Sequence, residues 1–252
     1  MKEITSKDNR IYKKCFQLGQ KKYRDKEEKF IVEGEKSVKE AYKSGRTTLI
    51  VVNSDYGGKY DFDEANTVFM TGKLFNKVAQ TETSQGIAAI VNKKEPENFM
   101  NRNQGNIVVL DKVQDPGNIG TIIRTAEAAG YSGIITIKGT ADVYSPKVVR
   151  AAAGAMLRMP IMQVEDAQSL IEILAKENKT ITATSLDAET LFYDADLSKN
   201  VALIIGNEGN GVDPLLQQQA CVNIKIPMEG ETESLNAAVA AGILMYQSIK
   251  KG

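Results

Sequence analysis

The sequence predicts an α/β fold with a parallel sheet in its C-terminal domain and a smaller α/β domain before it. After residue 106, short apolar runs typical of fully buried strands alternate with helical patterns, as in parallel sheets covered on both faces. The polar stretch "KKEPENFMNRNQGN", with Pro96 and Gly105, has the composition of a linker. We therefore expect domains at 1–95 and 106–252, joined by a linker at 96–105.

The N-terminal domain is predicted to begin with a helix from Asn9 to about Tyr23, where apolar residues recur at helical spacing among basic ones. Gly34 ends the following strand, "KFIVEG", and Gly45 stops the helix "EKSVKEAYKSG". The other expected elements are the strands "TTLIVVN", "TVFM" and "GIAAIVN" and the helix "GKLFNKVAQ".

The C-terminal domain is predicted to contain the strands "NIVVLD", "GIITIK", "IMQV", "TITATSL", "VALIIGNE" and "VNIKIPM". Asn118 is the expected N-cap of the first helix, which ends at Gly130, and Ser145 with Pro146 opens the helix "PKVVRAAAGAMLRM". Further helices are expected at "AQSLIEILAKEN", after Asp213-Pro214, and after Ser234. The last helix is apolar nearly all the way round, so we expect it to be buried on every side.

The composition excludes several classes of protein. The 252 residues include no histidine, which excludes Ser-His-Asp triads, histidine metal sites and imidazole general bases. Cys15 and Cys221 are far apart and lack metal-ligand spacing, so we expect free thiols, no metal site and a cytoplasmic protein. The N-terminus lacks the apolar core of a signal peptide, and no run of about 18 apolar residues is present to cross a membrane.

Positive charge is concentrated at the N-terminus of a chain whose net charge is zero. Residues 1–30 contain ten Lys or Arg and five Asp or Glu. Such a segment is typical either of a protein that binds nucleic acid or of a solvated helix face with Lys–Glu pairs. If it binds RNA, the expected contacts are Arg10, Lys13, Lys14, Lys21 and Lys22.

Three polar loops follow predicted strands, at 115–124, 206–212 and 228–236. They are expected to converge, because sites in open α/β sheets lie at the carboxyl ends of strands. The first loop lacks the G-x-G-x-x-G of dinucleotide-binding folds, which argues against an NAD-dependent oxidoreductase. Arg124 is placed either to meet a phosphate or as a surface cation of a capped helix. "GNEGNG" is either a turn or a close approach for a ligand.

The segments "LDKVQDPGNIGTIIRTAEAAG", "LIIGNEGNGV" and "IPMEGETESLNAAVAAGILMYQ" resemble, in this order, the three signature motifs of the SpoU/TrmH family. Its members are RNA ribose 2′-O-methyltransferases of the SPOUT class that use S-adenosylmethionine. The resemblance covers residues 105–250. More loosely, "FIVEGEKSVKEA" and "TETSQGIAAIV" resemble the small substrate-binding α/β domain of rRNA-modifying members, which is related to RNA-binding ribosomal proteins.

The resemblance implies a deep trefoil knot that holds the cofactor, no metal, and a homodimer in which the last helix packs against a second subunit. The implied catalytic residues are Asn118, Arg124, Glu208, Ser234 and Asn236. The implied cofactor-binding residues are Thr184, Leu186, Gly206, Ile226, Met228 and Leu235, with Gly206 leaving space for adenosine. The family proposal makes the arginine the base. Because a free arginine is almost never deprotonated, we prefer the more limited role in which Arg124 binds the 2′-oxygen and the adjacent phosphate and stabilises developing negative charge.

The expected substrate is RNA, and 23S rRNA is favoured because tRNA-acting members often carry only short helical extensions. Two alternatives stay open: a tRNA 2′-O-methyltransferase and a non-catalytic, ribosome-associated RNA-binding protein.

Overall fold

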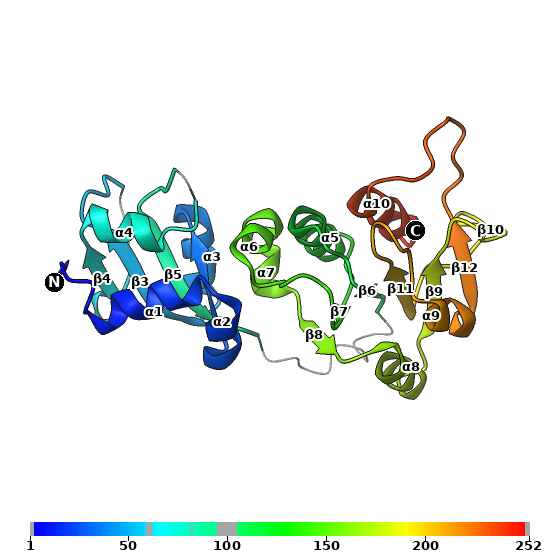
Figure 1. Cartoon of the computed structure of the whole chain (residues 1–252), viewed down its shortest axis with the longest axis horizontal. Coiled ribbons are helices and arrows are strands. Elements are labelled where there is room, and N and C mark those ends of the chain that lie inside the picture. Colours follow the sequence, from blue (N-terminus) through cyan, green and yellow to red (C-terminus); the bar gives the residue numbers. More distant parts are fainter. Residues whose placement is uncertain (1–2, 59–61, 82, 95–104, 250–252) are drawn as a thin grey trace. The chain divides into compact units, whose positions relative to one another are not determined.

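The computed structural model describes residues 3–58, 62–81, 83–94 and 105–249 (Figure 1). The chain divides into two compact units, one of Met1–Lys94 with Tyr144–Leu157 and one of Glu95–Val143 with Arg158–Gly252. Apart from Gly105, the expected linker at 96–105 lies outside the described residues, so the domain boundaries stay a prediction.

The first unit is built on a mixed five-stranded sheet in the order β1-β4-β3-β5-β2. Its elements are β1 (Glu3–Ile4), α1 (Arg10–Leu18), α2 (Lys21–Glu27), β2 (Lys29–Glu33), α3 (Glu35–Lys43), β3 (Thr47–Asn53), the 3₁₀ turn η1 (Glu64–Asn66), β4 (Thr67–Met70), α4 (Gly72–Val78), β5 (Ile87–Asn92) and α6 (Pro146–Ala152), with most of α7 (Ala155–Arg158). Helices α1 and α4 cover one face of the sheet, where Tyr12, Leu18 and Phe75 are buried. Strands β1 and β4 pair in parallel, which holds the loop after Ile4 beside the start of α4.

The helix expected from Asn9 to Tyr23 is two helices, α1 and α2. Gln20 between them is extended, with φ −107° and ψ 137°. The buried Arg24 donates from Nη1 to the carbonyl oxygen of Leu18 at 2.8 Å, which satisfies an acceptor that the end of α1 leaves open. The five expected RNA-binding cations are therefore divided between two helices: Arg10, Lys13 and Lys14 on α1, and Lys21 and Lys22 on α2.

The second unit is built on a seven-stranded sheet in the order β10-β12-β9-β11-β6-β7-β8, in which every pair is parallel. The predicted parallel sheet is confirmed. Its elements are β6 (Ile107–Leu110), α5 (Pro116–Ala128), β7 (Gly133–Ile137), β8 (Ile161–Val164), α8 (Ala167–Lys176), β9 (Thr180–Thr184), β10 (Thr190–Leu191), β11 (Val201–Ile205), α9 (Pro214–Gln219), β12 (Val222–Lys225) and α10 (Ala237–Gln247).

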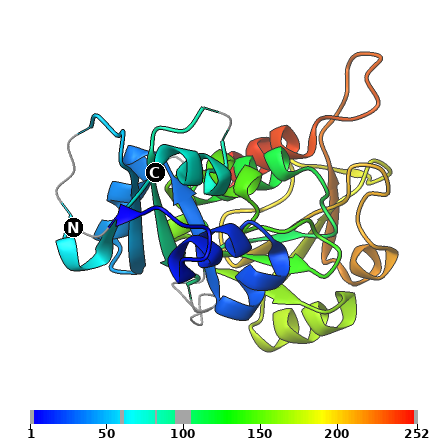
Figure 2. The ribbon, with the colours of Figure 1, turned by 60° about the vertical axis from the view of Figure 1, so that its left-hand side comes forward.

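Helices cover both faces of this parallel sheet (Figures 1 and 2). On one face, Leu170 and Leu174 of α8 and Leu216 of α9 pack against β6 and β11. On the other face lie α5 and α10, which pack against each other. Because both faces are covered, all residues of β6, β7 and β11 are buried, as their continuous apolar runs predict.

Three helix boundaries differ from the predictions. Helix α5 begins at Pro116, and Asp115 is its N-cap, with Oδ1 accepting the N–H of Asn118 at 2.7 Å. Helix α10 begins at Ala237, with Asn236 and not Ser234 as its N-cap. The helix opened by Ser145 is broken into α6 and α7, where Ala153 has a φ of 49°.

Helix α10 is apolar all round but is buried on one face only. Ala238, Ala241, Leu244 and Met245 are buried, whereas the opposite face exposes Val239, Ile243 and Tyr246, with Ile249 just beyond the helix. The expected burial of the opposite face depends on a second subunit and stays a prediction. Among the described residues, no helix is both long and apolar enough to cross a membrane.

Candidate functional site

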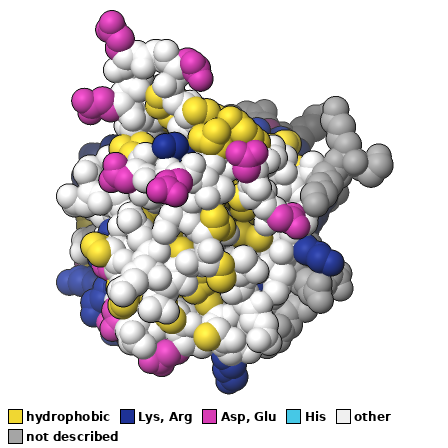
Figure 3. Space-filling view, turned by 90° about the vertical axis from the view of Figure 1, so that its right-hand side faces the viewer, with side chains coloured by type: hydrophobic (Ala, Val, Ile, Leu, Met, Phe, Trp, Pro, Cys, Tyr) yellow, Lys and Arg dark blue, Asp and Glu magenta, His cyan; other side chains and the backbone are white. Residues whose placement is uncertain are grey.

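The three polar loops converge at one edge of the parallel sheet, as predicted. They follow β6, β11 and β12, and side chains of all three are joined by hydrogen bonds. The loop between β12 and α10 projects from this edge (Figure 1). Glu229, Glu231 and Glu233 on this loop are exposed, and acidic side chains gather on the projection at the top of Figure 3.

Glu208 joins the loop after β11 to the start of α5. Its carboxylate accepts the N–H of Gln114 at 3.0 Å and that of Asp115 at 3.2 Å, and it also accepts from Asn118 Nδ2 at 3.0 Å. Burial alone raises the pKa of the Glu208 carboxyl, but the hydrogen bonds that it accepts outweigh burial and hold this pKa below its ordinary value. Glu208 is therefore ionised at neutral pH and held as an acceptor at the helix start.

Asn118 connects Glu208 to the last helix. While its Nδ2 donates to Glu208, its Oδ1 accepts from Asn236 Nδ2 at 2.8 Å. The Oδ1 of Asn236 in turn accepts the N–H groups of Ala238 and Val239 and so caps α10. One chain of hydrogen bonds thus passes through all three loops, and it uses three of the five expected catalytic residues.

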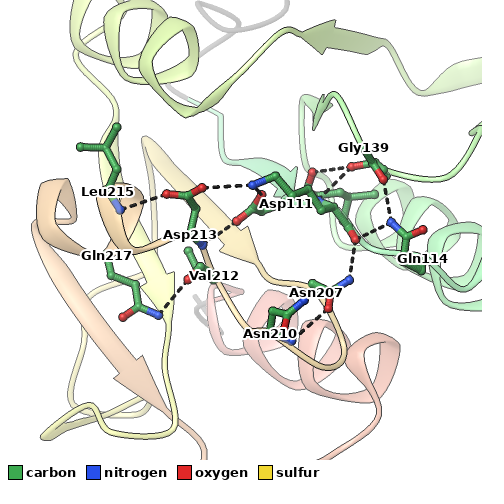
Figure 4. Close-up of polar contacts among 12 residues, drawn as sticks. Asp111, Gln114, Gly139, Asn207, Asn210, Val212, Asp213, Leu215 and Gln217 are labelled. Atoms are coloured by element: carbon green, nitrogen blue, oxygen red, sulfur yellow. Dashed lines mark hydrogen bonds and ion pairs between the residues drawn. The ribbon is translucent and has the colours of Figure 1, made fainter.

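A second polar network joins the loops after β6 and β11, and the sequence analysis missed it (Figure 4). Asp111, at the end of β6, is 1% exposed, and its Oδ2 accepts the N–H of Asp213 at 2.6 Å. Burial raises the pKa of Asp111, and the Asp213 N–H and Lys112 offset this only in part. An acid directly after a buried strand in "VVLD" was the available signal.

Lys112 completes this second network. Its ammonium donates to Asp213 Oδ2 at 3.0 Å, an interaction that raises the pKa of Lys112. Its carbonyl oxygen accepts from Asn207 Nδ2 and from Gln114 Nε2, both at 2.8 Å. Lys112 thereby ties the loop after β6 to both ends of the loop after β11, which carries Glu208.

Gly206 is required by the loop itself. A Cβ on Gly206 would lie 2.2 Å from the carbonyl carbon of Gly211 and 2.4 Å from the nitrogen of Val212. The loop folds back here because Asn207 and Gly211 exchange two backbone hydrogen bonds of 2.9 Å. Close contact within the loop thus gives a structural reason for this glycine, and its expected role in leaving space for adenosine stays a prediction.

A pocket of about 600 Å³ opens beside these networks, within the usual size range for small-molecule sites. Its lining includes the six residues expected to bind the cofactor, which are Thr184, Leu186, Gly206, Ile226, Met228 and Leu235. Glu208, Ser234 and Asn236 also line it. The lining combines apolar side chains with amides and two carboxylates, Asp187 and Glu208, against one cation, Lys225. This donor set fits a nucleoside that carries a positive charge.

Two expected catalytic residues stand apart from the hydrogen-bonded chain. The side chain of Arg124 is exposed on α5 and makes no hydrogen bond or ion pair within the described residues. Ser234 lines the pocket without a hydrogen bond to any described side chain. Across the part of the chain that the structure describes, no group of His, Cys, Asp and Glu is arranged to hold a metal ion.

Comparison with known proteins identifies this arrangement. A model of the SpoU rRNA Methylase family matches residues 105–246, more than half of the chain. The chain belongs to this family. A second model, of the MRM3-like substrate binding domain, matches residues 9–89 of this SpoU methylase.

Relatives match this SpoU methylase over nearly its full length. It is 37% identical to the 23S rRNA (guanosine(2553)-2′-O)-methyltransferase RlmP of Bacillus subtilis, over 98% of each chain. The AdoMet-bound rRNA methyltransferase of Sinorhizobium meliloti superposes with a TM-score of 0.86 at 32% identity, covering 98% of this chain and 97% of that one. The AdoMet complex of the SpoU methyltransferase AviRb from Streptomyces viridochromogenes superposes with a TM-score of 0.83 at 25% identity, covering 95% and 97%.

These matches confirm the resemblance, the fold class and the cofactor. The protein is an RNA 2′-O-ribose methyltransferase that uses S-adenosylmethionine. The trefoil knot implied for the family is consistent with this fold.

Proposed function

We propose that this SpoU methylase modifies a ribose 2′-hydroxyl of 23S rRNA. The observation that carries the proposal is the chain of hydrogen bonds from Glu208 through Asn118 to Asn236, which joins the three family motifs beside the pocket. The full-length similarity to a 23S rRNA enzyme and the match to a substrate-binding domain support the choice of RNA. With rRNA as substrate, the protein acts in the cytoplasm.

The deciding experiment compares 2′-O-methylation across rRNA and tRNA from cells with and without this protein. A single 23S rRNA ribose that loses its methyl group, and regains it with purified protein and S-adenosylmethionine, is the expected result. Loss of a methyl group at a tRNA ribose instead would show that the substrate is tRNA and not 23S rRNA. Unchanged methylation of every RNA, together with normal cofactor binding, would overturn the proposal in favour of a non-catalytic RNA-binding protein.

The pocket residues hold the cofactor, and Glu208 and Asn118 fix the edge of the site at which the ribose enters. S-adenosylmethionine supplies a methyl group already activated by its sulfonium, so the chain must mainly align the acceptor and assist loss of its proton. Thr184, Leu186, Gly206, Ile226, Met228 and Leu235 enclose the nucleoside part. The exposed acidic loop at 229–233 adds negative charge near a positively charged ligand.

Arg124 acts on the acceptor and not on the cofactor. Its guanidinium is exposed and has no partner among the described residues, so it is available to a phosphate or a developing alkoxide. An arginine side chain is almost never deprotonated in a protein, which makes stabilisation of negative charge the role that fits its chemistry. Ser234, which also lines the pocket, is placed to contact the incoming ribose.

The protein is a homodimer that pairs through α10. The exposed stripe of Val239, Ile243, Tyr246 and Ile249 is apolar, and Val239 and Tyr246 are 51% and 53% exposed. A continuous stripe of this kind, on a helix that already packs against α5, is typical of a self-association surface.

Light scattering should give the mass of two 27.6 kDa chains at micromolar concentration. Ile243→Asp with Tyr246→Asp should give one chain, whereas Thr232→Asp in the exposed loop should leave the dimer intact. A wild-type monomer that binds cofactor would contradict the dimer.

A further inference from the structure

Three lysines of the first unit gather with no acidic partner among the described residues. Lys7 lies in the loop between β1 and α1, and Lys73 and Lys77 lie one turn apart on α4. All three are exposed, and none takes part in an ion pair within the described ranges. Residues at i and i+4 of a helix lie about 5–6 Å apart at Cβ, so two of the three share one side of α4.

Backbone hydrogen bonds hold the loop of Lys7 close to α4. Strands β1 and β4 pair in parallel with Ile4 opposite Met70, and the N–H of Thr71 donates to the Ile4 carbonyl at 3.2 Å. Ser6 holds the turn that carries Lys7, because its Oγ accepts the N–H of Asp8 at 3.1 Å and its carbonyl accepts that of Asn9 at 3.2 Å. The loop of Lys7 is therefore held against the start of α4.

The positive charges of the three lysines repel one another. Lys7 lowers the pKa of Lys77 below its ordinary value, and Lys73 adds a smaller effect in the same direction. A neighbouring positive charge disfavours the charged form, so this cluster is unfavourable until an anion neutralises it.

Some other cations of the first unit are held in ion pairs. Lys13 on α1 lies 3.2 Å from Asp8, and Lys14 lies 3.5 Å from Glu27. Asp8, the acid next to Lys7 in sequence, thus directs its carboxylate to Lys13. These pairs give two of the expected RNA contacts on α1 a local role as Lys–acid pairs.

We propose that Lys7, Lys73 and Lys77 form a binding surface for the phosphodiester backbone of the substrate RNA. Lysine binds phosphate as a point charge, and an RNA strand offers phosphates in series that relieve the repulsion of several ammonium groups together. The surface gives affinity without sequence preference, because phosphate contacts position a strand and base contacts specify it. This inference rests on the proposed function, since it assumes that the first unit receives RNA.

The test measures RNA binding by the full chain, with a fluorescent 23S rRNA fragment and anisotropy over a range of salt concentrations. The test variant combines Lys7→Gln, Lys73→Gln and Lys77→Gln. The matched control combines Lys39→Gln, Lys93→Gln and Lys138→Gln, which removes the same charge from lysines in ion pairs. Circular dichroism and calorimetry with S-adenosylmethionine check that both variants are folded and bind cofactor.

The test variant should lose at least about 10-fold in affinity, and its plot of log K against log salt should flatten by about 2–3, near one counterion for each lost contact. The control should stay within about 2-fold of wild type. RNA should also raise the pKa of Lys77 toward its ordinary value, as followed by NMR of the lysine side chains. Equal losses of RNA affinity in the two variants, or an unchanged RNA affinity in the test variant, would overturn the proposed binding surface.

The methylation assay separates this inference from the proposed function. At saturating RNA the test variant should methylate at the wild-type rate with a raised KM. If wild-type protein binds RNA but methylates none, the proposed function fails while the binding comparison still decides the surface.

Discussion

Asn118→Asp is the sharpest test of the hydrogen-bonded chain, because it changes one atom of the side chain. The substitution keeps the oxygen that accepts from Asn236 Nδ2 at 2.8 Å. It replaces the donor that lies 3.0 Å from Glu208 Oε1 by a carboxylate oxygen. The carboxylate at position 118 and that of Glu208 then face each other where a hydrogen bond was formed before.

The magnitude follows from that distance. Two unit charges about 3 Å apart repel by about 5 kcal/mol at an effective dielectric constant of about 20. Glu208 is exposed and can turn away, but it then gives up the N–H groups of Gln114 and Asp115. We therefore expect a loss of about 2–3 kcal/mol in the free energy of unfolding at pH 7.

The loss should depend on pH with a definite sign. Repulsion raises the folded-state pKa of the carboxyl pair above its unfolded values, near about 4. The destabilisation is therefore small below about pH 4, where the pair holds a proton, and grows as the pH rises toward 7. Urea unfolding followed by circular dichroism at both pH values, at one protein concentration, measures the difference.

Two further variants serve as controls. Asn118→Ala removes both hydrogen bonds without adding charge, so its cost should differ less between the two pH values than that of Asn118→Asp. Adding Glu208→Gln to Asn118→Asp removes the repulsion and provides an amide donor, and should recover most of the lost stability. An Asn118→Asp protein as stable at pH 7 as at pH 4, relative to wild type, would refute the assigned contact between these side chains.

Two more substitutions separate chemistry from structure. Arg124→Ala should change the free energy of unfolding by no more than about 0.5 kcal/mol and leave cofactor affinity in calorimetry unchanged, since the Arg124 side chain bonds to none of the described residues. Its single-turnover methylation rate should fall by at least about 10²–10³-fold, and Arg124→Lys should recover little of it. A near-normal rate in Arg124→Ala would remove Arg124 from the mechanism. Gly206→Ala should lower both stability and cofactor affinity, because its Cβ would lie 2.2 Å from the carbonyl carbon of Gly211. Gly209→Ala is the control and should lower neither, since its Cβ would meet only Asn207 Oδ1 at 3.6 Å. Normal cofactor binding by Gly206→Ala would show that the loop can move apart at this contact without harm to the site.

The sequence was sufficient for features that depend on local composition. Buried parallel strands are continuous apolar runs, so the sheet of the second unit could be predicted, and polar loops at strand ends indicated where the site lies. Helix starts were less predictable where several capping residues compete. Asp115 and Asn118 are both good N-caps, as are Ser234 and Asn236, and tertiary contacts decide between them.

Features that depend on distant contacts left little signal in the sequence. At the break between α1 and α2, the buried Arg24 donates a hydrogen bond to the Leu18 carbonyl oxygen, a contact that the sequence does not indicate. Asp111 was overlooked because its partner, Asp213, is 102 residues further along the chain. The two-residue strands β1 and β10 are too short to show any periodicity.

The strand order of the parallel sheet has a consequence for how the chain acquires its structure. Strand β6 is the first strand of the second unit to be synthesised, yet it lies inside the sheet, between β7 and β11. Its register with β11 aligns Ile107 with Ala202, so that edge of β6 stays unpaired until some 95 further residues have left the ribosome. Pairings this distant in sequence fold slowly, and an open apolar edge in the meantime is prone to aggregate. Production of this protein should therefore depend on slow translation or on chaperones more than that of a helical protein of equal length.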